Sequence, residues 1–136
     1  MTIKIGELAK RTDCPVVTIR FYENEGLLPP PQRGDNNYRL YDETLVERLQ
    51  FIRHCRALNM SLEDIKNLLN YKDWPQRTCD RVNELLDQHI ERVESYIQIQ
   101  LKLKEQLVFL RGQCSGSRTT DTCGVLRELS QLITNP

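Results

Sequence analysis

The sequence lacks any apolar run close to the roughly 20 residues that a membrane-spanning helix needs. Its first residues, Met-Thr-Ile-Lys-Ile, lack the basic and apolar regions of a secretory signal peptide. It also lacks an excess of either charge, because 19 Lys and Arg residues balance 19 Asp and Glu residues. We therefore expect a cytoplasmic protein with no membrane partner, in which any basic surface is local.

Common catalytic motifs are absent as well. The sequence contains no nucleophile elbow, no phosphate-binding glycine loop and no evident pair of catalytic carboxylates. Its two histidines, His54 and His89, lie in predicted helices without an evident cysteine partner. Because 136 residues with 39% hydrophobic content form only a modest core, we expect a protein that is not an enzyme.

The N-terminal part of the sequence predicts two short helices and a hairpin. Residues 5–12 place apolar side chains at helical spacing, and a second helix can begin at Pro15, where a missing N–H costs nothing. That helix should end at Gly26, because prolines at 29–31 forbid its continuation. Residues 33–41 combine turn formers with alternating Tyr and Leu, which is typical of a wing beside a helix-turn-helix.

Two further helices have clear start signals. Asp42 is a favourable N-cap for a helix whose apolar face includes Leu49 and Cys55. Ser61, followed three residues later by an aspartate, predicts another helix that ends near Leu69. The sequence therefore predicts a mainly α fold.

Residues 79–112 contain no proline and no internal glycine, so we expect one long helix there. A heptad seam of nine positions runs along it: Val82, Leu86, His89, Val93, Tyr96, Gln100, Leu103, Leu107 and Leu110. Such a helix is a rod of roughly 50 Å, too long for this chain to cover, and needs a partner helix. A Ser, Thr and Gly loop at 113–124 then precedes a short helix that should fold back on the rod.

Five cysteines, an odd number, argue against a disulfide framework in a protein without an export signal. We expect Cys14, at a turn, and Cys55, on an apolar helix face, to be small buried side chains. Cys114 and Cys123 bracket eight loop residues, a spacing that lets two thiolates reach one ion but does not match a structural zinc knuckle. Spacing alone leaves a metal site, free thiols and a disulfide open.

Several motifs, in order, resemble the MerR family of transcription regulators. The motifs are IGELA at 5–9, TIRFYE at 18–23, EGLL at 25–28, NYRLY at 37–41 and RLQFIR at 48–53. The likeness continues through the long helix, so it covers nearly the whole chain, and it is most similar to the lead- and cadmium-responsive branch.

The resemblance implies a mainly α protein in three parts. A winged helix-turn-helix DNA-binding domain occupies residues 1–75, a long antiparallel coiled-coil dimerisation helix residues 76–112, and a metal-binding loop with a short helix residues 113–136. It further implies a homodimer that binds double-stranded operator DNA and, when metal binds, distorts the DNA so that RNA polymerase starts transcription.

The resemblance also implies DNA contacts by Thr18, Arg20, Tyr22, Arg33, Tyr38 and Arg39. Arginine side chains match phosphate oxygens and guanine edges, and tyrosine hydroxyls can donate to phosphates. Any one of these tyrosines can instead pack between helix and wing, so both interpretations stay open. Thr18 is the weakest of the six candidates.

For the metal site, the resemblance implies three thiolate ligands: Cys79, Cys114 and Cys123. Cys79 lies about 50 Å along the helix from Cys114, so the two cannot share an ion within one chain. In an antiparallel dimer, Cys79 of one protomer meets Cys114 and Cys123 of its partner, which links metal binding to the pose of two DNA-binding domains. Three thiolates form a soft site that favours Pb(II), Cd(II) or Hg(II) over hard ions. The resemblance to the lead- and cadmium-responsive branch implies Pb(II) first, then Cd(II) or Hg(II).

The sequence differs from other metal-responsive branches of the family, and these differences narrow the choice of metal ion. The loop contains no histidine, and Ser115 rather than a second cysteine follows Cys114, which argues against a two-zinc site. A cysteine at position 79 argues against Cu(I), and four clustered cysteines for an iron–sulfur centre are missing. The alternatives are a redox sensor using a Cys114–Cys123 disulfide, and a metal scavenger, which would not need the helix-turn-helix.

Overall fold

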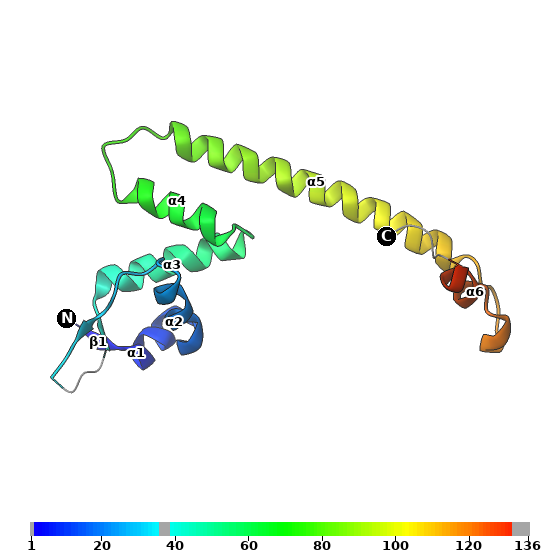
Figure 1. The fold of residues 1–136 in the computed structure, drawn as a ribbon, viewed down its shortest axis with the longest axis horizontal. Helices are drawn as coiled ribbons and strands as arrows, with labels where there is room; N and C mark the ends of the chain where they lie inside the picture. Colours follow the sequence, from blue (N-terminus) through cyan, green and yellow to red (C-terminus); the bar gives the residue numbers. More distant parts are fainter. Residues whose placement is uncertain (1, 36–38, 132–136) are drawn as a thin grey trace. The chain divides into compact units, whose positions relative to one another are not determined.

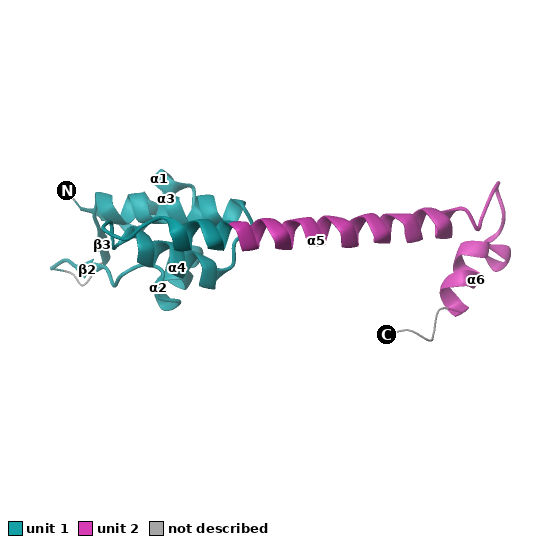
Figure 2. Ribbon diagram, turned by 90° about the horizontal axis from the view of Figure 1, so that it is seen from above, with its two compact units in different colours: residues 1–86 teal, residues 87–136 magenta. Residues whose placement is uncertain are grey.

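The computed structural model describes residues 2–35 and 39–131, and most of them are helical (Figure 1). The chain divides into two compact units, Met1–Leu86 and Asp87–Pro136 (Figure 2). The boundary between these units falls inside a single helix, and the domain limits expected at residues 75 and 112 stay predictions.

The first unit contains a small sheet and four helices that precede the long helix. The elements in order are β1 (Ile3–Lys4), α1 (Ile5–Thr12), α2 (Val16–Asn24), β2 (Gln32–Arg33), β3 (Arg39–Tyr41), α3 (Glu43–Ala57) and α4 (Leu62–Lys72). The strands pair antiparallel in the order β1-β3-β2, with Gln32 opposite Leu40 and Ile3 opposite Tyr41. The predicted helix-turn-helix and hairpin are confirmed.

Local signals fix the ends of these helices. Asp13 adopts a left-handed conformation (φ 52°) after α1, and Gly26 does so (φ 80°) after α2, where a side chain would be strained. Asp42 accepts a hydrogen bond from the Leu45 N–H at 3.1 Å, and the Ser61 hydroxyl caps α4 in the same way. Both predicted N-caps are therefore confirmed.

The hydrophobic core of the first unit combines all four of these helices with β3. Its largest fully buried side chains are Leu8, Ile19, Leu27, Tyr41, Leu49, Ile52, Ile65 and Leu69. Cys14 and Cys55 are also buried, as the sequence predicted. The first turns of the long helix add Leu85 to the same core.

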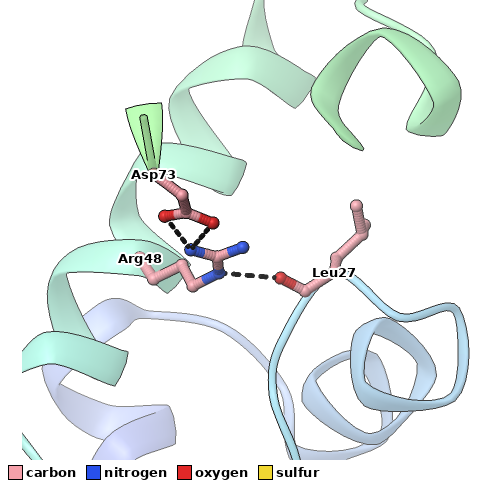
Figure 3. Close-up of polar contacts among 3 residues, drawn as sticks. All are labelled: Leu27, Arg48 and Asp73. Carbon is pink, nitrogen blue, oxygen red and sulfur yellow. Dashed lines mark hydrogen bonds and ion pairs between the residues drawn. The ribbon is translucent and has the colours of Figure 1, made fainter. Parts of the chain in front are cut away.

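Arg48 of α3 connects three segments of the first unit (Figure 3). Its Nε donates to the Leu27 carbonyl oxygen at 3.0 Å, and its Nη1 lies 3.0 Å from Asp73 Oδ1, just after α4. The planar guanidinium allows both contacts at once, which a lysine ammonium at this position would not reproduce. Arg48 thereby ties the segment after α2 and the end of α4 to α3.

The second unit consists of most of α5 (Asp80–Arg111), a 3₁₀ turn at Thr120–Thr122 and α6 (Gly124–Gln131). The long helix and the short final helix were predicted, and the 3₁₀ turn inside the loop was not. Residues 132–136, the end of the part expected to contain the metal-binding loop and short helix, lie outside the described residues. Glu128 of α6 shares an open groove with Leu103, Leu107 and Leu110 of α5. In the part of the chain that is described, no helix has the length and apolarity to cross a bilayer.

Most apolar side chains of α5 face solvent in the single chain. The larger exposed ones are Leu86, Ile90, Val93, Tyr96, Ile97, Ile99, Leu101, Leu103, Leu107, Val108 and Phe109. Five of them belong to the predicted heptad seam, so most of that face of α5 has no cover within the described residues.

Replacing Arg48 should destabilise the first unit. We expect Arg48→Met to lower the free energy of unfolding by about 2 kcal/mol, because the Leu27 carbonyl loses a charged hydrogen-bond donor in a partly buried position. Urea denaturation followed by circular dichroism at one protein concentration measures the change. The control Asp73→Asn removes only the exposed ion pair and should cost less than about 1 kcal/mol. Equal losses in both variants would show that the ion pair dominates.

Candidate functional site

The predicted contact residues of the helix-turn-helix lie in different environments. Arg20 on α2 and Arg33 on β2 are exposed, and Thr18 is half-buried. Tyr22 is only 7% exposed and belongs to the core, so nearly all of its ring packs inside the unit. Tyr38 lies outside the described residues.

Glu23 connects α2 to the wing. Its Oε2 accepts a hydrogen bond from the Tyr41 hydroxyl at 2.7 Å, and its Oε1 lies 3.3 Å from Nη1 of Arg39. The geometry makes the Arg39 contact an ion pair rather than a directed hydrogen bond. Burial, and then the hydrogen bond to Glu23, raise the pKa of Tyr41, which keeps its hydroxyl protonated as a donor. The wing strand β3 is thereby held against α2.

Two exposed apolar residues on α2 were not among the sequence candidates. Val17 is 77% exposed and Phe21 44% exposed. With Arg20 and Asn24 they follow the spacing i, i+3, i+4 and i+7, which places all four on one helix face. That spacing is visible in the sequence, but their exposure became clear only once Ile19 and Tyr22 were seen in the core.

Cys114 and Cys123 come together at the start of α6. A hydrogen bond from the Leu126 N–H to the Cys123 sulfur is the main cause of a lowered pKa at Cys123. The Cys114 thiol, the Val125 N–H and the charge of Arg118 act in the same direction. Backbone N–H groups at a helix N-terminus stabilise an anion, so the surroundings of Cys123 favour its thiolate form.

A close backbone approach positions this thiol pair. A Cβ atom at Gly124 would overlap the carbonyl oxygen of Gln113, so only glycine lets α6 begin so near the end of α5. On the α5 side, Arg111 donates to the Cys114 carbonyl oxygen at 2.9 Å. These contacts hold the loop closed, although Cys114 and Cys123 are nine residues apart.

The other cysteines have different surroundings. Cys79 is exposed and directly precedes α5. Burial raises the pKa of Cys14 and of Cys55, so both remain neutral thiols and poor metal ligands. Among the described residues of one chain, no group of three or more Cys, His, Asp or Glu side chains is placed to hold a metal ion. The fold therefore brings together two of the three predicted ligands, and Cys79 is not joined to them within the chain.

Two family models match the chain. The model described as MerR HTH family regulatory protein matches residues 3–72, and the model described as MerR, DNA binding matches residues 46–110. Among curated proteins, the chain is 44% identical to the HTH-type transcriptional regulator ZntR homolog of Haemophilus influenzae, over 80% of this chain and 81% of that protein. It is 30% identical to the mercuric resistance operon regulatory protein of Bacillus cereus, over 95% and 98%.

A solved structure agrees along nearly the whole length. The transcription regulator PbrR691 from Ralstonia metallidurans CH34, in complex with lead(II), superposes with a TM-score of 0.84 at 48% identity, covering 93% of this chain and 98% of that chain. Its fold confirms the helix-turn-helix, the wing, the long helix and the short final helix. The chain therefore belongs to the MerR family of helix-turn-helix, DNA-binding transcription regulators.

Proposed function

We propose that this protein is a cytoplasmic, homodimeric regulator that activates transcription of metal-resistance genes when a soft heavy-metal ion binds. The observation on which this depends is the contact of the Cys114 and Cys123 side chains at the N-terminus of α6. Two preformed sulfur ligands, one with a lowered pKa, favour a thiolate-seeking ion over Mg(II) or Ca(II).

Cys79 is the proposed third ligand, supplied by the partner subunit. The exposed apolar seam of α5 needs a second helix, and a second copy of α5 offers the same seam. If the two helices run antiparallel, the residue that precedes α5 in one protomer lies near the residues that follow α5 in the other. Each of the two symmetric sites then contains Cys79 of one chain with Cys114 and Cys123 of its partner.

Pb(II) is the proposed inducer, with Cd(II) and Hg(II) next. A set of three thiolates and no histidine suits large soft ions. The 48% identical structure contains lead(II), and a 30% identical relative regulates mercuric resistance. Cd(II) has the same ligand preference as these two ions.

The first unit is proposed to bind a pseudo-palindromic operator through Thr18, Arg20, Tyr22, Arg33, Tyr38 and Arg39. Arg20 and Arg33 are exposed and lie outside the core, and their guanidinium groups suit phosphate or base contacts. Arg39 also forms an ion pair with Glu23, and a contact between Arg39 and DNA would compete with this ion pair. Metal binding then changes the DNA distortion that the dimer imposes and allows RNA polymerase to start.

A redox function rests on the same thiol contact. Adjacent Cys114 and Cys123 thiols could lose two electrons and two protons to a peroxide and form a disulfide. Such a sensor would not need Cys79. A requirement for Cys79 therefore distinguishes the metal-sensing function from the redox function.

The first experiment titrates the reduced protein with Pb(II), Cd(II), Hg(II) and Zn(II), following thiolate-to-metal charge-transfer absorption. We expect one ion per protomer, and we expect Cys79→Ser, Cys114→Ser and Cys123→Ser each to weaken binding because each removes one ligand of a single site. The matched control Ser115→Ala, an exposed neighbour in the same loop, should bind as the wild type does. Unchanged affinity in Cys79→Ser would exclude the shared site and leave a metal site within one loop. Weak binding of every ion, together with a thiol count that falls under mild peroxide, would favour the redox function.

Alkylation tests the chemistry proposed for Cys123. Because its pKa is lowered, the pH midpoint of its reaction with iodoacetamide should lie below the ordinary range of a cysteine thiol. Arg118→Gln should raise that midpoint, because a positive charge near the thiolate is lost. Arg127→Gln removes an equal charge from α6 that is not among the causes of the lowered pKa of Cys123, and is the control. Fragmentation of the tryptic peptides by tandem mass spectrometry gives the rate at Cys123, because Arg118→Gln leaves Cys114 and Cys123 on one peptide. Equal midpoints in both variants would contradict the assignment.

Gly124→Ala tests whether the backbone approach positions the ligands. The added methyl overlaps the Gln113 carbonyl, so α6 must shift and Cys123 must move away from Cys114. We expect Pb(II) affinity to fall at least about tenfold, a loss typical of disturbed ligand support. Gly6→Ala adds the same methyl where no atom lies within 4 Å and should leave affinity unchanged. An unchanged Kd in Gly124→Ala would show that the loop adjusts freely.

A further inference from the structure

The outward face of α2 exposes two apolar side chains that do not pack in the core. Val17 is 77% exposed and Phe21 44% exposed, one turn apart on the stripe that also includes Arg20 and Asn24. Single exposed apolar side chains are common, but two adjacent ones beside an arginine form a contact surface of mixed chemistry. Val17 lies at the N-terminal end of this stripe.

The position of Val17 fits the major groove of DNA. In helix-turn-helix proteins, the N-terminal residues of the second helix contact base edges, and Val17 is the second residue of α2. The first turn of α2, which is fully described, contains no acidic residue that would repel phosphates. Glu23 is turned toward Tyr41 and Arg39 instead.

Among the base edges in the major groove, thymine alone presents a methyl group, which apolar side chains contact. We propose that Val17 contacts the C5 methyl group of one thymine in each operator half-site, with Phe21 excluding water beside it. Arg20, between them on the stripe, is left to make the polar contact with a neighbouring base or phosphate. The inference rests on the proposed function, because it requires a specific operator.

The test begins by selecting operators from random DNA duplexes with the full-length protein. Each thymine of the selected site is then replaced singly by deoxyuridine, which removes only the C5 methyl group. We expect one position in each half-site at which the replacement weakens wild-type binding about fourfold, the effect of losing one buried methyl-sized group. Val17→Ala changes both protomers and so removes the contact in both half-sites. It should bind the thymine operator about sixteenfold more weakly, the product of two fourfold losses, and should not respond to deoxyuridine at either position.

Leu58→Ala is the matched control, because Leu58 is also exposed (62%) but follows α3 rather than lying on α2. It should keep the wild-type affinity and the full response to deoxyuridine. Thermal melting should be unchanged in Val17→Ala, since the side chain contributes little to the core.

The outcomes distinguish a failure of the proposed function from a failure of the thymine contact alone. If no sequence is selected, both the proposed function and this inference are overturned. If an operator is selected but no deoxyuridine substitution weakens the wild type, only the thymine contact is overturned, whatever the variant does. The same holds if Val17→Ala keeps the full deoxyuridine response, or loses affinity equally for operator and random DNA.

Discussion

The apolar side chains that α5 exposes carry a free-energy cost of about 25 cal/mol for each Å² of apolar surface in contact with water. A helix of 32 residues cannot cover its own seam, and α6, with eight residues, reaches only its C-terminal end. This requirement for a second helix determines the rest of the proposed architecture. In the proposed antiparallel dimer, it would set the two ends of α5 side by side between protomers. Cys79 could then complete a site whose other two proposed ligands the single chain already brings together.

The cysteines show how surroundings decide the chemistry of one residue type. Cys14 and Cys55 are buried among apolar side chains, where burial raises the pKa and an uncharged thiol packs well. Cys123 lies at a helix N-terminus, where backbone N–H groups lower its pKa. The surroundings of Cys123 depend on Gly124. A larger residue at this position would separate the start of α6 from Gln113 and its neighbour Cys114.

Local rules explain what the sequence predicted correctly. Asp42 and Ser61 are N-caps through hydrogen bonds within four residues, and Gly26 ends α2 through its own backbone conformation. The burial of Cys14 and Cys55 follows from helical periodicity and turn position. The proposed pair of Cys114 and Cys123 was also open to prediction, because a short loop keeps its ends near one another.

Contacts between segments that are far apart in the sequence could not be predicted from these local rules. The ion pair of Glu23 with Arg39 depends on where the wing folds against α2, and 16 positions separate the two residues. The overlap that excludes a side chain at Gly124 depends on the path of the whole loop. Tyr22 was given two interpretations because its neighbours in space were unknown; the structure places its ring in the core.

These long-range contacts bear on how a metal signal could reach DNA. Glu23 fixes α2 to the wing, and Arg48 fixes the segment after α2 and the end of α4 to α3. Leu85 packs the first turns of α5 into the same core, only six residues after Cys79. A ligand that binds Cys79 therefore acts on a segment joined to a tightly connected unit. In the proposed dimer, such a unit would move as one body. The change transmitted to an operator would then be in the spacing and angle of two whole domains rather than in the shape of either recognition helix.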